Sequence, residues 1–166
     1  MAKLGVLGVG NTLKGDDGIG VVLVDRLKGE DFADEVEFDE VEFHEVGTSG
    51  MNIVHYLAKL DRAIIVDAIR SEGSPGDALV FRPEEVDGDM TVRSTHDANL
   101  LEAIELSETL GEKPERIIIM GIIPKDMLLR DDLTPELKEK LPELEDKLRE
   151  QIKSLLEEED GTTPSS

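Results

Sequence analysis

The sequence contains no cysteine, few basic residues and no long apolar run. The absence of cysteine excludes disulfides, thiolate metal sites and a cysteine nucleophile, and it fits a cytoplasmic protein. No run approaches the roughly 20 apolar residues that a membrane-spanning helix needs. The N-terminal segment MAKLGVLGV is too short and too interrupted by glycine for a signal peptide. We therefore expect a cytoplasmic protein that does not insert into a membrane.

Basic residues are also few. The chain has 18 lysines and arginines against 39 acidic residues, which gives a net charge of −21. A surface of this sign repels phosphate backbones, which argues against nucleic-acid binding. It either favours a basic protein partner or reflects a salty or hot cytoplasm. With 166 residues, 39% hydrophobic and 34% charged, the chain has the composition of one globular domain. We assign residues 1–160 to this domain and 161–166 to a flexible tail.

Apolar runs and helical periodicity alternate along the chain. They predict strands over 3–9, 36–46, 62–68, 78–82 and 116–123, and helices over 17–28, 50–60, 96–110 and from Pro135 onward. The 36–46 pattern slips at Asp39-Glu40, so a bulge lies there or the strand begins at Val41. Pro142 should interrupt or kink the last helix. This order predicts an α/β fold, with a mainly parallel twisted sheet of about five strands, helices on both faces and strand 78–82 antiparallel at an edge.

A glycine-rich turn follows the first strand, with the sequence GVGNTLKGDDGIG. It fails the dinucleotide fingerprint, because the glycine after Gly8-Val9-Gly10 comes two positions late at Gly15. It also fails the phosphate-loop motif, since Asp16 and Asp17 occupy the positions of the lysine and the hydroxyl residue. The turn therefore does not hold a nucleotide, and its carboxylates suit a cation.

Polar residues gather where the predicted strands end, and ligands of open α/β sheets bind beyond the carboxyl ends of strands. They are Asn11, Asp16 and Asp17 after the first strand, Glu45 closing the second, Asp67 closing the third, and His96 beginning the third helix. Two carboxylates and an imidazole suit a divalent transition metal with open positions for water or substrate.

Each of these residues also has a purely structural interpretation. Asp16 or Asp17, taken alone, fits the cap of a helix. Asp67 precedes a turn, where aspartate is common. A single histidine near a helix start, such as His96, is more often structural than catalytic. The metal-site hypothesis depends on the coincidence of their positions in the predicted fold.

The segments GVGNTLKGDDGIGV, EVGTSG, IIVDAI, STHD and GIIP, in that order, resemble the hydrogenase maturation endopeptidase family. The resemblance covers about residues 3–145. Members of that family trim a C-terminal extension from the large subunit of nickel–iron hydrogenases. They have an α/β fold with helices on both faces of a twisted sheet. The resemblance thus implies the same fold as the pattern of elements.

The resemblance also implies which residues act. The metal-contacting and catalytic positions fall on Asp17, Asp67 and His96, with Asp17 standing where members often have glutamate. Glu45, before Gly47 and Thr48, occupies a position linked to substrate handling, and Asn11 and Asp16 complete the expected substrate contacts. The metal is then a divalent ion, nickel already installed in the precursor rather than a resident zinc.

The implied function is removal of the C-terminal extension from a nickel–iron hydrogenase large-subunit precursor, which is then the expected partner. The chain lacks the H-E-x-x-H pattern of zinc proteases, and either a carboxylate or a metal-polarised water could attack the peptide. Two other functions remain open. One is a chaperone that checks for nickel without cutting, and the other is a small metal-dependent hydrolase of a different substrate.

Overall fold

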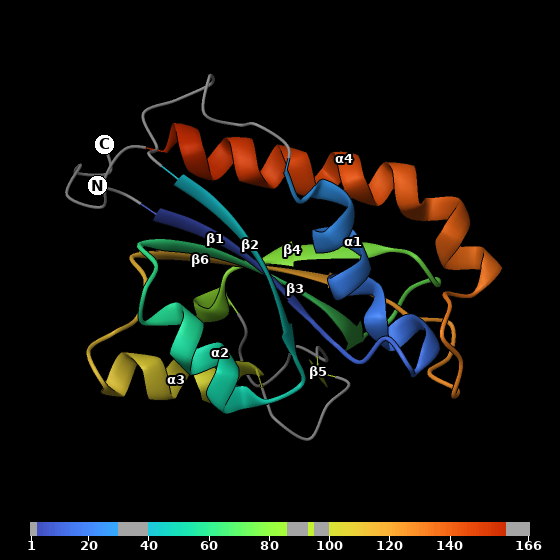
Figure 1. Cartoon of the computed structure of the whole chain (residues 1–166), viewed down its shortest axis with the longest axis horizontal. Helices are drawn as coiled ribbons and strands as arrows, with labels where there is room; N and C mark the ends of the chain where they lie inside the picture. The colour runs from blue at the N-terminus through green and yellow to red at the C-terminus, as the bar shows by residue number, and fades with distance from the viewer. Residues whose placement is uncertain (1–2, 30–39, 86–92, 95–99, 159–166) are drawn as a thin grey trace.

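A computed structural model describes residues 3–29, 40–85, 93–94 and 100–158. Its elements run along the chain in the order shown in Figure 1. They are β1 (Lys3–Val9), η1 (a 3-10 helix, Gly15–Gly18), α1 (Ile19–Leu27), β2 (Glu40–Gly47), α2 (Gly50–Leu57), β3 (Arg62–Arg70), β4 (Ala78–Phe81), η3 (a 3-10 helix, Pro83–Glu85), β5 (Arg93–Ser94), α3 (Leu100–Thr109), β6 (Arg116–Ile122) and α4 (Pro135–Glu157).

The main sheet has the strand order β2-β1-β3-β6-β4, with the short β5 paired to the end of β3. Strands β2, β1, β3 and β6 are parallel, and β4 lies antiparallel to β6 at the edge. The predicted α/β fold, with a mainly parallel sheet and an antiparallel edge strand at 78–82, is therefore confirmed.

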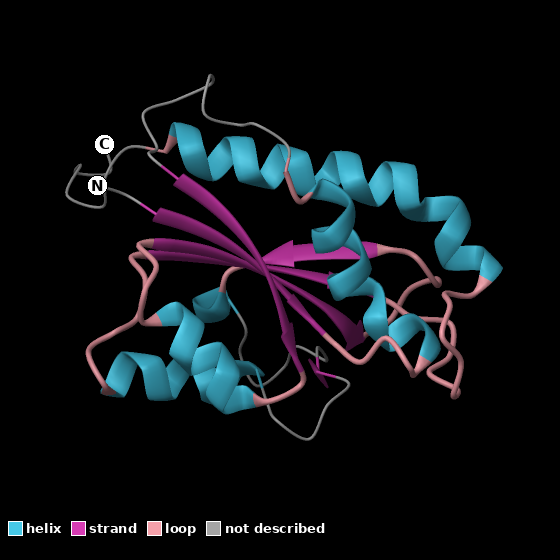
Figure 2. Cartoon of the chain, in the orientation of Figure 1, coloured by secondary structure: helices cyan, strands magenta, loops and turns pink. Residues whose placement is uncertain are grey.

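Helices cover both faces of this sheet, as Figure 2 shows. Helices α1 and α4 pack on one face against side chains such as Val6 and Val66, while α2 and α3 pack on the other against Leu7 and Ile65. Successive strand residues point to opposite faces, so a strand covered on both sides must be apolar at every position. This requirement explains the continuous apolar runs of β1, β3 and β6.

Several predicted boundaries shift in the structure. Strand β2 begins at Glu40, one residue before the predicted alternative Val41, and residues 30–39 lie outside the described part of the chain. Helix α4 continues through Pro142 and is not interrupted there, although its ribbon bends near the N-terminal end in Figure 1. A proline leaves one carbonyl of the preceding turn without its helical donor, which bends a helix without ending it.

The ends of the other predicted elements are close to those observed. The predicted helix 17–28 begins as the 3-10 turn η1 and becomes α-helical at Ile19. Helix α3 is described from Leu100, so its predicted start at 96 lies outside the described residues, as does the tail at 161–166. No helix among the described residues has both the length and the apolarity needed to cross a membrane.

Candidate functional site

The glycine-rich turn between β1 and α1 is built by very close backbone packing. A Cβ atom on Gly20 would lie 2.1 Å from the carbonyl oxygen of Val66 in β3. One on Gly10, whose φ is +146°, would lie 2.0 Å from the carbonyl oxygen of Asp17. Both distances are far below van der Waals contact, so these positions require glycine. Gly10 and Gly20 thus allow segments of the chain's own backbone to pack closely together.

Asp17 lies inside this turn with only 1% of its surface exposed. Its Oδ2 accepts a hydrogen bond of 3.0 Å from the backbone N–H of Asn11. The side chain of Asn11 in turn accepts one of 2.9 Å from the N–H of Leu13. The carboxylate of Asp17 is therefore held at the point where the chain leaves β1.

Asp67 is fully buried within β3, next to the same turn. Strands β1 and β3 are parallel neighbours whose pairing ends at Gly8 and Val66, so Asp67 is the first residue of β3 beyond that pairing. The 3-10 helix η1, which carries Asp17, contacts β3. The topology therefore brings the elements that carry Asp17 and Asp67 together at the carboxyl ends of two adjacent strands.

His96, the third predicted metal-contacting residue, falls in the segment 95–99, outside the described residues. Within the described part of the chain, no group of three or more His, Cys, Asp or Glu side chains is placed to hold a metal ion. Two carboxylates without the imidazole are not such a group. The three-residue site therefore stays a prediction that depends on His96.

The end of β2 lies beside the glycine-rich turn. The N–H of Gly10 donates a hydrogen bond of 2.9 Å to the carbonyl oxygen of Gly47, whose φ of +80° favours glycine. The neighbouring Glu45 and Thr48 are exposed to solvent. Of the predicted substrate-contacting residues, Glu45 and Thr48 are thus accessible to solvent, while Gly47 joins the end of β2 to the glycine-rich turn through its backbone.

Asp16 has a different environment from its neighbour Asp17. It is fully buried, and its carboxylate accepts hydrogen bonds from the segment 124–134, which connects β6 to α4. The N–H and Oγ1 of Thr134 each donate at 2.8 Å, and the N–H groups of Lys125 and Asp126 donate at 2.9 and 3.5 Å. These contacts favour a structural role over contact with substrate. Asp16 does not cap its own helix, as the alternative prediction had it, but binds the residue that precedes α4.

Sequence reasoning did not identify Thr134 as a partner of Asp16. The Thr134-Pro135 pair signalled only the start of a helix. The two residues are 118 positions apart, and no local pattern links residues at such a separation. The sequence showed only that Asp16 and Asp17 form an acidic pair. The predicted metal site uses one of them, Asp17.

Three leucines next to the turn are exposed. Leu13 lies in the turn itself, and Leu128 and Leu129 lie in the segment 124–134, with exposed fractions of 63%, 63% and 85%. The two segments are joined by backbone hydrogen bonds, from the N–H of Arg130 to the oxygen of Leu13 and from the N–H of Gly15 to the oxygen of Arg130. Apolar side chains displayed beside a candidate site are a feature of surfaces that contact other proteins.

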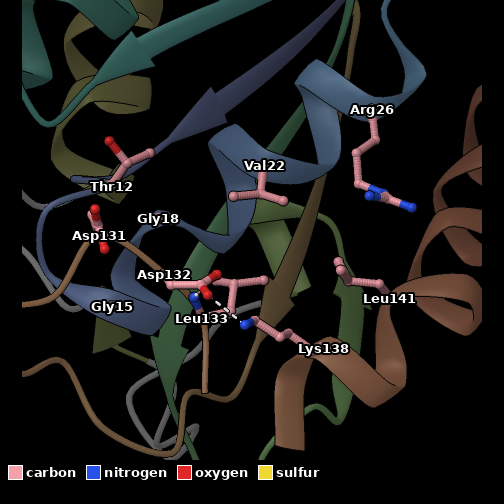
Figure 3. Close-up of a pocket in the computed structure, with 10 residues that line it drawn as sticks. All are labelled: Thr12, Gly15, Gly18, Val22, Arg26, Asp131, Asp132, Leu133, Lys138 and Leu141. Atoms are coloured by element: carbon pink, nitrogen blue, oxygen red, sulfur yellow. Dashed lines mark hydrogen bonds and ion pairs between the residues drawn. The ribbon is translucent and has the colours of Figure 1, made fainter. Parts of the chain in front are cut away.

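A cavity of about 390 Å³ lies next to the glycine-rich turn, between η1, α1 and the start of α4 (Figure 3). It is lined by Thr12, Gly15, Gly18, Val22, Arg26, Asp131, Asp132, Leu133, Lys138 and Leu141. Asp17 and Asp67 are not among its lining residues, so the cavity is distinct from the carboxylate pair.

Comparison with known proteins gives consistent matches. A family model described as hydrogenase maturation protease matches residues 23–151. The chain is 36% identical to the hydrogenase 2 maturation protease of Escherichia coli over 132 residues, which cover 78% of each chain.

Solved structures agree with these sequence matches. The hydrogenase maturating endopeptidase HybD from E. coli superposes with a TM-score of 0.76 and 30% identity, covering 93% of this chain and 94% of that one. A [NiFe] hydrogenase maturation protease HycI from Thermococcus kodakarensis gives a TM-score of 0.67 at 26% identity, covering 95% and 94%.

Proposed function

The chain belongs to the hydrogenase maturation protease family, and we propose that it removes the C-terminal extension of a nickel–iron hydrogenase large-subunit precursor after nickel insertion. The observation that carries this proposal is the pair of buried carboxylates, Asp17 and Asp67, on elements that meet at one end of the sheet. We retain the cytoplasm as the compartment, since the chain has no cysteine.

In this proposal Asp17, Asp67 and His96 contact the nickel that the precursor carries. Carboxylate and imidazole groups are suitable ligands for a divalent nickel ion. Burial supports the role of the carboxylates, because a buried anion is costly without a cation or hydrogen-bond donors, and a bound cation would offset that cost. A precursor without nickel would lack this interaction, so cleavage would follow nickel insertion.

The reaction is hydrolysis of one peptide bond of the precursor. Water adds to the carbonyl carbon, the C–N bond breaks, and the proton lost by the water is delivered to the departing amine. A carboxylate within reach can take up the proton of the water, and a metal ion can lower the pKa of a bound water to about 7. In this proposal a buried carboxylate would take up the proton of the water, and the nickel carried by the substrate would lower the pKa of that water.

The surroundings of the carboxylates suit a protein substrate. Asn11 lies in the turn that carries Asp17, and Glu45, Gly47 and Thr48 lie at the end of β2, which is joined to that turn. We propose that these four residues contact the precursor chain. The exposed side chains of Leu13, Leu128 and Leu129 beside them provide apolar contact area. We assign Asp16 to holding the turn in place rather than to the substrate.

The test is processing of a purified, nickel-loaded precursor, followed by mass spectrometry of its C-terminal peptide. We expect Asp17→Asn and Asp67→Asn each to lower the rate about 1,000-fold or more, equivalent to roughly 4 kcal/mol of transition-state stabilisation. Asp25→Asn, which alters an exposed aspartate of α1, is the matched control and should process at the parent rate. His96→Gln extends the test to the third residue. Full processing by the double variant Asp17→Asn, Asp67→Asn would refute the site.

The precursor assay and an assay with small esters or amides separate the two other functions. A chaperone that checks for nickel would bind the precursor and leave its C-terminus intact. A general metal-dependent hydrolase would turn over small esters or amides in the absence of any precursor, whereas the protease should not.

A further inference from the structure

The cavity between η1, α1 and the start of α4 is lined by both apolar and charged residues. The apolar part of the lining consists of Gly15 and Gly18 of η1 together with Val22, Leu133 and Leu141. In Figure 3, Thr12 and Asp131 lie on one side of the cavity and Arg26 and Leu141 on the other, with Val22 between them. This arrangement suits an elongated ligand with an aliphatic stem and a polar end.

Most charged side chains that line the cavity are paired with opposite charges of the chain itself. Arg26 forms an ion pair with Glu145 of α4. Lys138 forms one with Asp132, drawn as a dashed line in Figure 3. Both cations that line the cavity are thus engaged by carboxylates of the chain itself.

Asp131 is the exception. It is exposed, and its carboxylate forms no ion pair or hydrogen bond within the described part of the chain. The preceding Arg130 does not neutralise it, because the guanidinium of Arg130 pairs with Asp126 at 3.3 Å. The lining of the cavity therefore includes one uncompensated negative charge beside apolar residues, in a chain whose net charge is −21.

We propose that this cavity binds a lysine or arginine side chain of a protein partner. The methylene stem would lie on Val22, Leu133 and Leu141, and the cationic end would meet the carboxylate of Asp131, with the Thr12 hydroxyl beside it. Long basic side chains bury their stems on apolar surface while their charged ends remain partly hydrated. The identity of the partner rests on the proposed function, in which it is the hydrogenase precursor.

The cavity can be tested without any precursor. Nuclear magnetic resonance titration with N-acetyl-arginine amide should shift the backbone amide signals of Thr12, Gly15, Gly18 and Val22 in a saturable manner. N-acetyl-citrulline amide, which has a similar shape and no charge, should shift them at least about threefold more weakly, and Asp131→Asn should weaken arginine binding to the same extent. Glu139→Gln removes a nearby exposed carboxylate that does not line the cavity and should bind like the parent. Equal binding of the two probes, or equal binding by Asp131→Asn, would overturn the proposal.

A second measurement connects the cavity to the partner. With nickel-loaded precursor, Asp131→Asn should raise the KM for processing about threefold at low salt, and the difference should shrink as salt is added. Glu139→Gln should leave the KM unchanged. A KM unaffected by Asp131→Asn, in a parent protein that cleaves the precursor, would remove the precursor as the partner. Absence of cleavage by the parent protein would instead refute the proposed function and leave the probe titration to decide the cavity.

Discussion

The two ends of helix α4 are anchored by buried charges of opposite sign. At its N-terminal end, Asp16 accepts hydrogen bonds from Thr134, the residue that precedes the helix. At its C-terminal end, Arg62 donates to the carbonyl oxygens of Leu155 and Glu158. The exposed fractions of Asp16 and Arg62 are 0% and 1%. Each charge opposes the partial charge of the helix end that it meets, negative at the N-terminus and positive at the C-terminus.

The two anchors differ in what they connect. Arg62 is the first residue of β3, so it ties α4 to the amino end of the sheet, remote from the turns that form the candidate site. Asp16 directly precedes Asp17, so it ties α4 to the turn that carries a predicted metal-contacting residue. Substitutions at the C-terminal end of α4 should therefore affect stability alone, whereas substitutions at its N-terminal end should affect both stability and precursor processing.

The largest effect on stability is expected for Arg62→Met. This change leaves two backbone carbonyls at the end of α4 and the carboxylate of Glu115 without their buried donor and should lower the free energy of unfolding by about 3 kcal/mol. Urea denaturation measures it. Arg116→Met, which removes a partly exposed partner of Glu158 at the same helix end, should cost less than about 1 kcal/mol. An equal cost for both variants would contradict a special role of the buried arginine.

A smaller loss of stability, about 2 kcal/mol, is expected for Asp16→Asn. The amide group offers its own N–H atoms to donors that need an acceptor, so the link between the turn and α4 weakens. Processing should slow at temperatures where the variant is fully folded, because the adjacent Asp17 is no longer held in register. Thermal unfolding monitored beside precursor cleavage measures both effects.

Thr134→Val provides the matched control for this link. It removes the hydroxyl donor to Asp16 but keeps the backbone N–H donor, and it should show about half of the loss. If Asp16→Asn lost stability and processed the precursor at the parent rate, the two ends of α4 would be equivalent and the functional contrast would be wrong.

The smallest expected effect concerns the loss of stability at the N-terminal end of α4 when the pH is lowered. The hydrogen bond from Lys125 lowers the pKa of Glu136, and that from Lys138 lowers the pKa of Asp132. Groups with a lowered pKa contribute stability above their ordinary pKa of about 4, and this contribution is lost as the pH falls through the lowered value. The four side chains are between 38% and 61% exposed, so the contribution is small.

Denaturation at pH 6 and pH 3 tests this expectation. Glu136→Gln should lose less stability than the parent protein between the two values, because it lacks the pair that titrates. Glu139→Gln, which neutralises an exposed carboxylate outside these pairs, should follow the parent. A loss in Glu136→Gln as large as that of the parent would show that the exposed pair does not contribute to α4.

Much of the fold could be predicted because its causes are local. The apolar runs of β1, β3 and β6 identify strands that are buried on both faces of the sheet. The apolar stripe of α4 identifies a helix that covers one of these faces. Because ligands of open α/β sheets bind beyond the carboxyl ends of the strands, the same pattern predicts that Asp17 and Asp67 lie at one end of the sheet. The location of β2 was less certain, since its alternation slips at Asp39-Glu40, and the strand as described begins at Glu40.

The sequence by itself determined the elements, their order and the end of the sheet where the carboxylates gather. Side-chain periodicity follows from neighbouring residues, and strand direction follows from the alternation of strands and helices. Only the tertiary structure distinguished Asp16 from Asp17, which are adjacent and chemically identical. One meets Thr134, 118 positions away, and the other stays in the turn beside β3. It likewise decided that Gly10 and Gly20 make room for the chain's own backbone. Contacts of this kind depend on how distant segments pack, which no local pattern records.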